Sequence, residues 1–252
     1  MLRSLGHLAT PPKSQAILGP TQNLLLRMLP PDDLSLLLAD ASEVNLQPGA
    51  VLRDGREQPA CVCFPMTGIV SLDIVMRNEQ SAEAALVGHN SAVGLLTGLG
   101  VAHVHGRAVV QAPGRAINIP VKAFAAAARS SNIREMVVKG IALLFWETQQ
   151  NVGCAAIHDV QSRLCRWLLR CHDFCNGETI PLTQDFLARM LAVRRTTITV
   201  AASGLQDLGI IQYRRGIIQV LDRAALEQRS CECHAVIAEQ VRDMLAGKLD
   251  MH

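Results

Sequence analysis

Residues 182–220 read LTQDFLARMLAVRRTTITVAASGLQDLGIIQYRRGIIQV, and the pattern of apolar and polar positions changes along this stretch. Thr183 is a suitable N-cap, and Asp185 follows in the first turn, where the helix dipole favours a negative charge. The next apolar residues share one helical face over two turns: Phe186, Leu187, Met190 and Leu191. The pattern predicts a short helix that ends in a tight turn at 192–193.

A second helix is predicted after this turn. Its apolar residues recur at spacings of three and four, as on one face of a helix: Ile198, Ala201, Ala202, Leu205 and Leu208. The opposite side carries Thr196, Thr199, Val200 and Ser203, with Arg195 on the flank. Five of the seven residues in 194–200 are β-branched, which by propensity favours a strand. The spacing from Ile198 onward is helical, so we predict a helix.

A basic hairpin is predicted to follow the two helices. Residues 210–213 (IIQY) and 217–220 (IIQV) are rich in β-branched and aromatic side chains and read as paired strands. Arg214, Arg215 and Gly216 between them are interpreted as a three-residue turn, with the glycine at a position of positive φ. The order helix, turn, helix, hairpin predicts a winged helix-turn-helix, whose wing can contact a phosphate backbone.

Arginine is frequent around this motif. Residues 160–223 contain nine Arg, five acidic residues and no Lys, although the whole chain has a net charge of only +2. Guanidinium groups bind phosphate in a planar, bidentate way, so this composition favours nucleic acid as a partner. The alternative is a helix face whose arginines are simply solvated.

The N-terminal half has a different pattern, in which short apolar runs are separated by turn residues about every ten positions. These runs are CVCF (61–64), GIVSLDIV (68–75), AEAALV (82–87), RAVVQA (107–112) and RAINIP (115–120). Many short strands with regular turns are typical of an antiparallel sandwich or small barrel. A parallel α/β sheet is disfavoured because no long helical pattern separates the strands.

A long helix is predicted over 131–158, with Ser131 and Asn132 as its N-cap. It carries a heptad repeat of Val137, Ile141, Leu144, Thr148 and Asn151. One interpretation is a helix packed on its own β-domain. The other is a two-chain coiled coil in which the polar positions set the register, and this second one predicts a homodimer.

We therefore predict an α+β chain: an antiparallel β-roll or jelly roll, a long dimerisation helix and a winged helix-turn-helix. The predicted boundaries are a flexible extension (1–22), the β-roll domain (23–130), the dimerisation helix (131–158), the DNA-binding domain (159–230) and a helical tail (231–252).

Composition excludes several classes of protein. The chain is 49% hydrophobic and 18% charged, which is typical of a packed core and not of global disorder. No stretch approaches the ~18 uninterrupted apolar residues of a membrane span, and the start lacks the apolar region of a secretory signal. We expect a cytoplasmic protein whose eight Cys are thiols. GLLTGLG (94–100) lacks the Gly-Lys-Ser/Thr of a P-loop and no catalytic triad is recognisable, so no enzyme is expected.

Two groups of residues have side chains that can bind metals. Cys231 and Cys233 are close in sequence, but no zinc-finger spacing accompanies them, so unreactive thiols are the favoured interpretation and no metal is expected. A thiol- or metal-responsive regulator that uses Cys231 and Cys233 stays an alternative. His103 and His105 are interpreted as solvated loop residues.

The chain resembles the Crp/Fnr superfamily of bacterial transcription regulators over about 24–227. The resemblance rests on the motif at 182–220 and on LLLRMLPPDD, CFPMTGIVSL and ALVGHNSAVGLL, which are similar to a cyclic-nucleotide-binding β-roll. It implies that Arg195, Thr196, Thr199 and Val200 read bases and that Thr183 and Thr197 face phosphate. The remaining predicted DNA-binding residues are Arg194, Ser203, Arg214 and Arg215. By resemblance, RNA polymerase is a further partner.

The effector site departs from the family pattern. Members that bind cyclic AMP use a Gly-Glu pair for the ribose hydroxyl and an Arg-Ser pair for the phosphate. Here Gly94 is followed by Leu95, and the second pair reads Gly106-Arg107, shifted by one position. Thr148 matches a family Thr that touches the base, and Gln149 lies beside it. Cyclic AMP is therefore disfavoured and the effector is unknown; a constitutive regulator with a self-filled pocket is an alternative. Residues 1–60 contain no Cys, which disfavours the family's iron–sulfur mechanism.

Overall fold

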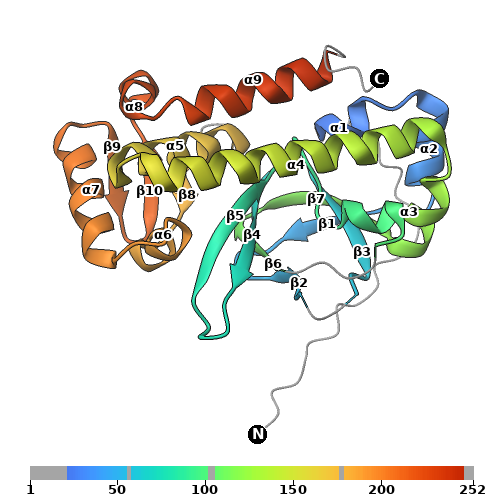
Figure 1. Cartoon of the computed structure of the whole chain (residues 1–252), viewed down its shortest axis with the longest axis horizontal. Coiled ribbons are helices and arrows are strands. Elements are labelled where there is room, and N and C mark those ends of the chain that lie inside the picture. Colours follow the sequence, from blue (N-terminus) through green and yellow to red (C-terminus); the bar gives the residue numbers. More distant parts are fainter. Residues whose placement is uncertain (1–21, 56–57, 102–105, 176–178, 247–252) are drawn as a thin grey trace, which may run out of the picture.

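The computed structural model describes residues 22–55, 58–101, 106–175 and 179–246. Nearly all of the predicted N-terminal extension, together with His103 and His105, lies outside these residues. The described chain is an α+β structure with antiparallel sheets and a C-terminal helix-turn-helix, which confirms the predicted fold class (Figure 1). Within the described part, none of the helices has the length and apolar character to cross a bilayer.

The N-terminal domain is a roll of two antiparallel sheets. One has the order β2-β6-β4-β5, and its strands are Val51–Arg53, Arg107–Ala112, Ile69–Val75 and Ser81–Val87. The other has the order β1-β7-β3, and its strands are Ser42–Leu46, Gly114–Pro120 and Cys61–Pro65. Alternate small aliphatic side chains of these strands point inward and form the interior of the roll, among them Val70, Val87, Ala108, Val110 and Ala116.

Three short helices and a 3-10 turn close this domain. They are α1 (Leu24–Arg27), α2 (Pro31–Leu38), α3 (Val121–Ala127) and η1 (Leu95–Leu99). Asn23 caps α1 and is fully buried; its amide donates to Pro65 O and Ser91 O, both at 2.9 Å, so it joins the helix to the roll.

The long helix α4 (Ser131–Ile157) lies across the roll, and one of its faces packs on it (Figure 1). Its N-cap is Ser130, one residue before the predicted position, and the Ser130 hydroxyl donates to Asp33 Oδ1 instead of capping the helix. The face toward the roll includes Ile133, Met136, Val137 and Leu143.

The predicted dimer seam needs correction, because most of its residues pack on their own domain. Ile141 and Leu144 are half-buried against the core of the N-terminal domain. Val137 is 0% exposed within the single chain, and Asn151 donates to Ala84 O at 2.8 Å in strand β5. Both side chains therefore contact their own domain. The exposed apolar side chains of α4 include Phe145 (59% exposed) and Val152 (67% exposed). Phe145 directly follows Leu144, and Val152 directly follows Asn151, so each is one residue beyond a predicted seam residue. A one-residue shift turns a helix by about 100°, which changes the face that looks outward.

The C-terminal part is built on α5 (Val160–Phe174). Asp159 caps this helix as predicted, accepting from Ser162 N at 3.0 Å, and these hydrogen bonds lower the pKa of the Asp159 carboxyl. The core around Trp167 and Leu168 also includes Ile69 and Leu86 of the roll, so the two domains share buried apolar surface.

The described part of the chain ends in two helices, α8 (Arg223–Arg229) and α9 (Cys233–Leu245). Helix α9 runs back along α4 toward the N-terminal domain (Figure 1). Near its end, Met244 is buried in the N-terminal core. Helix α9 is therefore packed on the body of the molecule.

Candidate nucleic-acid interface

Helices α6 (Gln184–Met190) and α7 (Arg195–Asp207) form the predicted helix-turn-helix. The Thr183 hydroxyl accepts a hydrogen bond from Phe186 N at 3.2 Å and so caps α6. Ala192 takes a positive φ of 51° in the turn, a conformation that costs a non-glycine residue some energy but redirects the chain sharply. This turn places the start of α7 at the protein surface.

Helix α7 divides into a buried and an exposed face. Its buried side chains are Ile198, Ala201, Ala202 and Leu205, all in the predicted stripe, and they pack on α5 and α6. Leu208, predicted for the same stripe, is 57% exposed because the helix has ended there. The predicted DNA-facing residues are all exposed: Arg194, Arg195, Thr196, Thr197, Thr199, Val200 and Ser203.

Two contacts link the exposed face to α6. Arg195 Nη1 lies 3.4 Å from Asp185 Oδ1, and both side chains are exposed, so this ion pair is weak. The Thr199 hydroxyl lies 2.9 Å from Gln184 Oε1. Gln184 was not among the predicted site residues, because its role depends on a contact between two helices.

The wing consists of β9 (Ile211–Arg214) and β10 (Ile217–Val220). Arg214 pairs with Ile217, so the turn has two residues, Arg215 and Gly216, and not the predicted three. Both have positive φ, 52° and 77°, as in the type I′ turn whose twist matches that of the paired strands. The loop before α6 contributes a third strand, β8 (Ile180–Pro181), which the sequence did not predict.

The wing tip lies beside the start of the helix-turn-helix. A Cβ on Gly216 would be 3.7 Å from the Thr183 methyl group. Arg214 and Arg215 are both exposed. The exposed side of α7, the capping Thr183 and two guanidinium groups thus come from three segments of one compact unit.

Comparison with known proteins shows which family the helix-turn-helix and its wing resemble. Residues 162–229 match the Crp-like helix-turn-helix domain. The structure is also similar to a Crp/Fnr-family chain from Eubacterium rectale, with TM-score 0.63 and 15% identity over 80% of this chain and 94% of that one. The chain has the Crp/Fnr fold and its helix-turn-helix domain. None of the curated proteins matches it in sequence.

Two further structures show the same fold. A CRP-family regulator from Thermus thermophilus gives a TM-score of 0.62 at 15% identity, over 74% of this chain and 96% of that one. The c-di-GMP responsive global regulator CLP of Xanthomonas campestris gives 0.59 at 14% identity, over 75% and 98%. The N-terminal roll accordingly shares the fold of these structures.

The predicted effector residues of this Crp/Fnr roll have different environments. Gly94 has φ 96° and precedes η1, and Leu95 is buried, with its Cδ1 close to Gly140 of α4. Arg107 is exposed at the start of β6. The Thr148 hydroxyl donates to Leu144 O of its own helix at 2.8 Å, and Gln149 beside it is exposed. Leu95 therefore packs in the apolar core.

Proposed function

We propose that this chain is a DNA-binding transcription regulator that binds a two-fold symmetric operator as a homodimer. The observation that carries the proposal is the exposed face of α7, with Arg195 and Thr196 at its start and a basic wing beside Thr183. A helix of this kind enters the major groove with its N-terminal residues against base edges.

The proposed contacts divide into two sets. Arg195, Thr196, Thr199 and Val200 read bases; Val200 is 75% exposed and offers methyl groups to a thymine. The phosphate-facing residues are Thr183, Arg194, Thr197, Ser203, Arg214 and Arg215. Hydroxyl and guanidinium groups at the groove edges position the protein without reading sequence.

The proposed dimer forms along α4. Six residues of α4 follow spacings of four and three: Val138, Ala142, Phe145, Gln149, Val152 and Ala156. The last four are exposed, whereas Val138 and Ala142 are half-buried. Phe145 and Val152 stay exposed although the roll and α9 also contact this helix. A heptad face of this kind is buried when a second copy packs on it. The partner on this face is thus a second copy of the chain, in a register one residue later than predicted.

For the roll, we propose that cyclic AMP is not the effector. The Leu95 side chain cannot accept a hydrogen bond from a ribose hydroxyl, and Gly106 has no side chain to pair with a phosphate. Leu144 of α4 packs against the aliphatic interior of the roll, which favours the second candidate, a constitutive regulator with a self-filled pocket. RNA polymerase as a partner rests on the family resemblance.

The test is selection of DNA from a random pool by the full chain. We expect enrichment of an inverted repeat whose half-site centres are about 10 bp apart, so that two recognition helices enter successive major grooves. The Arg195→Ala variant is the control for readout by α7 and should enrich a less defined site. Recovery of fragments without any common sequence would contradict the proposal.

A further inference from the structure

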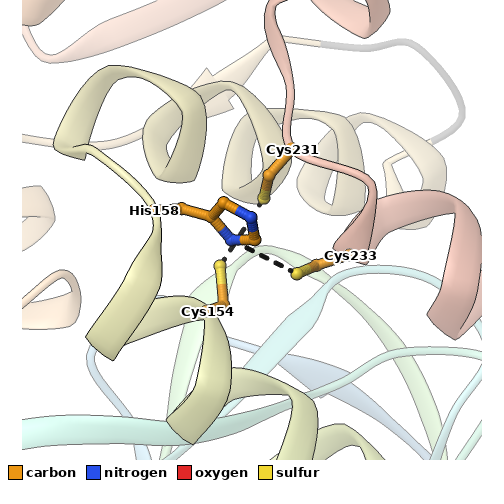
Figure 2. A group of neighbouring side chains, drawn as sticks. All are labelled: Cys154, His158, Cys231 and Cys233. Carbon is orange, nitrogen blue, oxygen red and sulfur yellow. Dashed lines mark hydrogen bonds between the residues drawn. The ribbon is translucent and has the colours of Figure 1, made fainter.

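Four potential metal ligands that are far apart in sequence meet at the joint between α4 and α5. They are Cys154, His158, Cys231 and Cys233 (Figure 2). Their ligand atoms all lie within 4.8 Å of one another. The sequence interpretation of Cys231 and Cys233 as unreactive thiols did not anticipate Cys154 and His158, because 72 residues lie between His158 and Cys231.

Two segments build this cluster. Cys154 lies in the last turn of α4 and His158 is the C-cap of that helix, so residues four apart share one face. Cys231 and Cys233 flank Glu232 where α8 passes into α9. All three thiols are buried and pack on one another.

We propose that Cys154, His158, Cys231 and Cys233 bind one Zn²⁺ ion in a tetrahedral site with three sulfur ligands and one nitrogen ligand. Bond lengths typical of zinc give tetrahedral edges of about 3.8 Å between sulfurs and about 3.6 Å between sulfur and nitrogen. Cys154 Sγ lies 3.5 Å from Cys231 Sγ, and Cys233 Sγ lies 3.6 Å from His158 Nδ1. The side chains are therefore almost at the spacing that the ion needs.

The groups around the cluster are those of a metal site. The other ring nitrogen of His158, Nε2, lies 3.2 Å from Glu232 Oε2, which leaves Nδ1 free to face the three thiols. A carboxylate on the second nitrogen is the usual partner of a metal-bound histidine. Gln150 Nε2 donates to Cys233 Sγ at 3.0 Å and so stabilises negative charge on that sulfur.

The charges also balance. Binding displaces three thiol protons into the buffer, so Zn²⁺ with three thiolates and a neutral imidazole carries one net negative charge. The Arg166 and Arg163 guanidinium groups lie near enough to Cys154 to interact with its charge. They offset the excess negative charge in this buried place.

A bound ion would join the end of α4 to the start of α9. The junction between α4 and the DNA-binding domain, at His158 and Asp159, lies inside this link. Loss of the ion would remove this link at the point where α5 begins, while Met244 of α9 would stay packed in the N-terminal core. The site is thus placed to hold the DNA-binding domain in one orientation relative to α4.

The experiment titrates the full, reduced and metal-stripped chain with Zn²⁺ against a chromophoric chelator, and with Co²⁺ as a spectroscopic probe. We expect one Zn²⁺ per chain, and a Co²⁺ complex with sulfur charge-transfer bands and the intense d–d bands of tetrahedral coordination. Cys154→Ser and Cys233→Ser should lose both signals. Cys61→Ser, which alters a half-buried thiol of strand β3, is the matched control and should keep them.

Glu232→Gln tests the histidine partner. It should keep the stoichiometry of one but weaken Zn²⁺ binding by about 10- to 100-fold, as removal of such partners does. Circular dichroism of each variant shows whether it folds. Even if a variant does not fold, the Co²⁺ spectrum of the unmodified chain shows whether the metal is bound tetrahedrally by sulfur ligands.

Three results would overturn the proposal. The first is a reduced, unmodified chain that takes up no stoichiometric Zn²⁺, and the second is a Co²⁺ complex with only the weak bands of octahedral coordination. The third is a Cys154–Cys231 disulfide found by peptide mapping together with no metal binding after reduction, which would make the cluster a redox pair. None of these results depends on DNA binding.

Discussion

Glu147 on α4 and Arg170 on α5 form an ion pair of 2.8 Å in which both side chains are buried. Glu147 also accepts a hydrogen bond from Leu86 N of strand β5, and the Arg170 guanidinium lies 4.7 Å from the centre of the Phe174 ring. The pair thus joins the roll, the long helix and the DNA-binding domain in one buried contact.

Breaking this pair should destabilise the fold strongly. Glu147→Gln removes one charge and leaves the Arg170 guanidinium buried without its counter-ion, which costs about 3–5 kcal/mol in comparable pairs. Urea unfolding followed by circular dichroism measures the loss. Glu135→Gln breaks the more exposed pair with Lys139 on the same helix and should change stability by less than ~1 kcal/mol. Equal losses of unfolding free energy in the two variants would show that burial does not make the Glu147–Arg170 pair more important for stability.

Glu83 should make stability depend on pH. Its carboxyl accepts from Trp167 Nε1 at 3.0 and 3.1 Å across the domain junction. Burial raises its pKa from 4.5 to about 8, although the Trp167 hydrogen bond and the Arg166 charge act in the opposite direction. The folded chain then binds a proton that the unfolded chain has lost. The free energy of unfolding should therefore fall as pH rises from about 4.5 to about 8. Each unit by which the pKa of Glu83 in the folded chain exceeds that in the unfolded chain corresponds to ~1.4 kcal/mol.

The Glu83→Gln variant isolates this effect. The amide keeps an oxygen for Trp167 but does not titrate, so its stability should vary less over the same pH range. Glu43→Gln changes an exposed carboxyl of strand β1 and should keep the dependence of the unmodified chain. If Glu83→Gln kept the full dependence, another group would be responsible.

Arg195→Ala and Arg214→Ala should affect DNA binding differently. Loss of a base contact at Arg195 should cost about 1–3 kcal/mol and relax the preference at one position of the half-site. Loss of a phosphate contact at Arg214 should weaken all sequences nearly equally and lower the slope of log affinity against log salt by about one. Titrations at several salt concentrations separate the two. An unchanged affinity and preference in Arg195→Ala would refute α7 as the recognition helix.

Val152→Asp should break the proposed dimer without unfolding the chain. Val152 is 67% exposed in the single chain, so the charge meets water in the monomer but an apolar partner in the dimer. Sedimentation should show monomers, and operator binding should disappear with the dimer. Ser131→Asp adds the same charge at an exposed position of the same helix and should stay dimeric. A monomeric unmodified chain at micromolar concentration would also refute the dimer.

Cyclic AMP should neither bind tightly nor change DNA affinity. Loss of two hydrogen bonds to charged groups, at ~1.5–3 kcal/mol each, weakens binding by about two to four orders of magnitude. Calorimetric titration with cyclic AMP and cyclic GMP tests this. Micromolar binding that Arg107→Ala abolishes would show that the neighbouring arginine grips the phosphate.

The helix-turn-helix was predictable because the residues that specify it lie close together in the sequence. The apolar residues Ile198 and Leu205 mark the buried face of α7 in spite of the β-branched run before them, since the helical spacing outweighs the strand propensity of single residues. The cap at Thr183 acts within three residues of its own position. The wing was predicted apart from the length of its turn, which depends on whether Arg214 pairs across the hairpin.

Only the tertiary structure shows which face of α4 the roll covers. It also brings together the four side chains of the candidate metal site. Two heptad faces of α4, one through Val137 and one through Val152, are both apolar enough to pack, and periodicity does not say which one the roll covers. Cys154 meets Cys231 only because α9 folds back along α4. Spacing along a chain determines which residues share a face of one helix. Contacts between segments more than seventy residues apart depend on how the packed core brings those segments together.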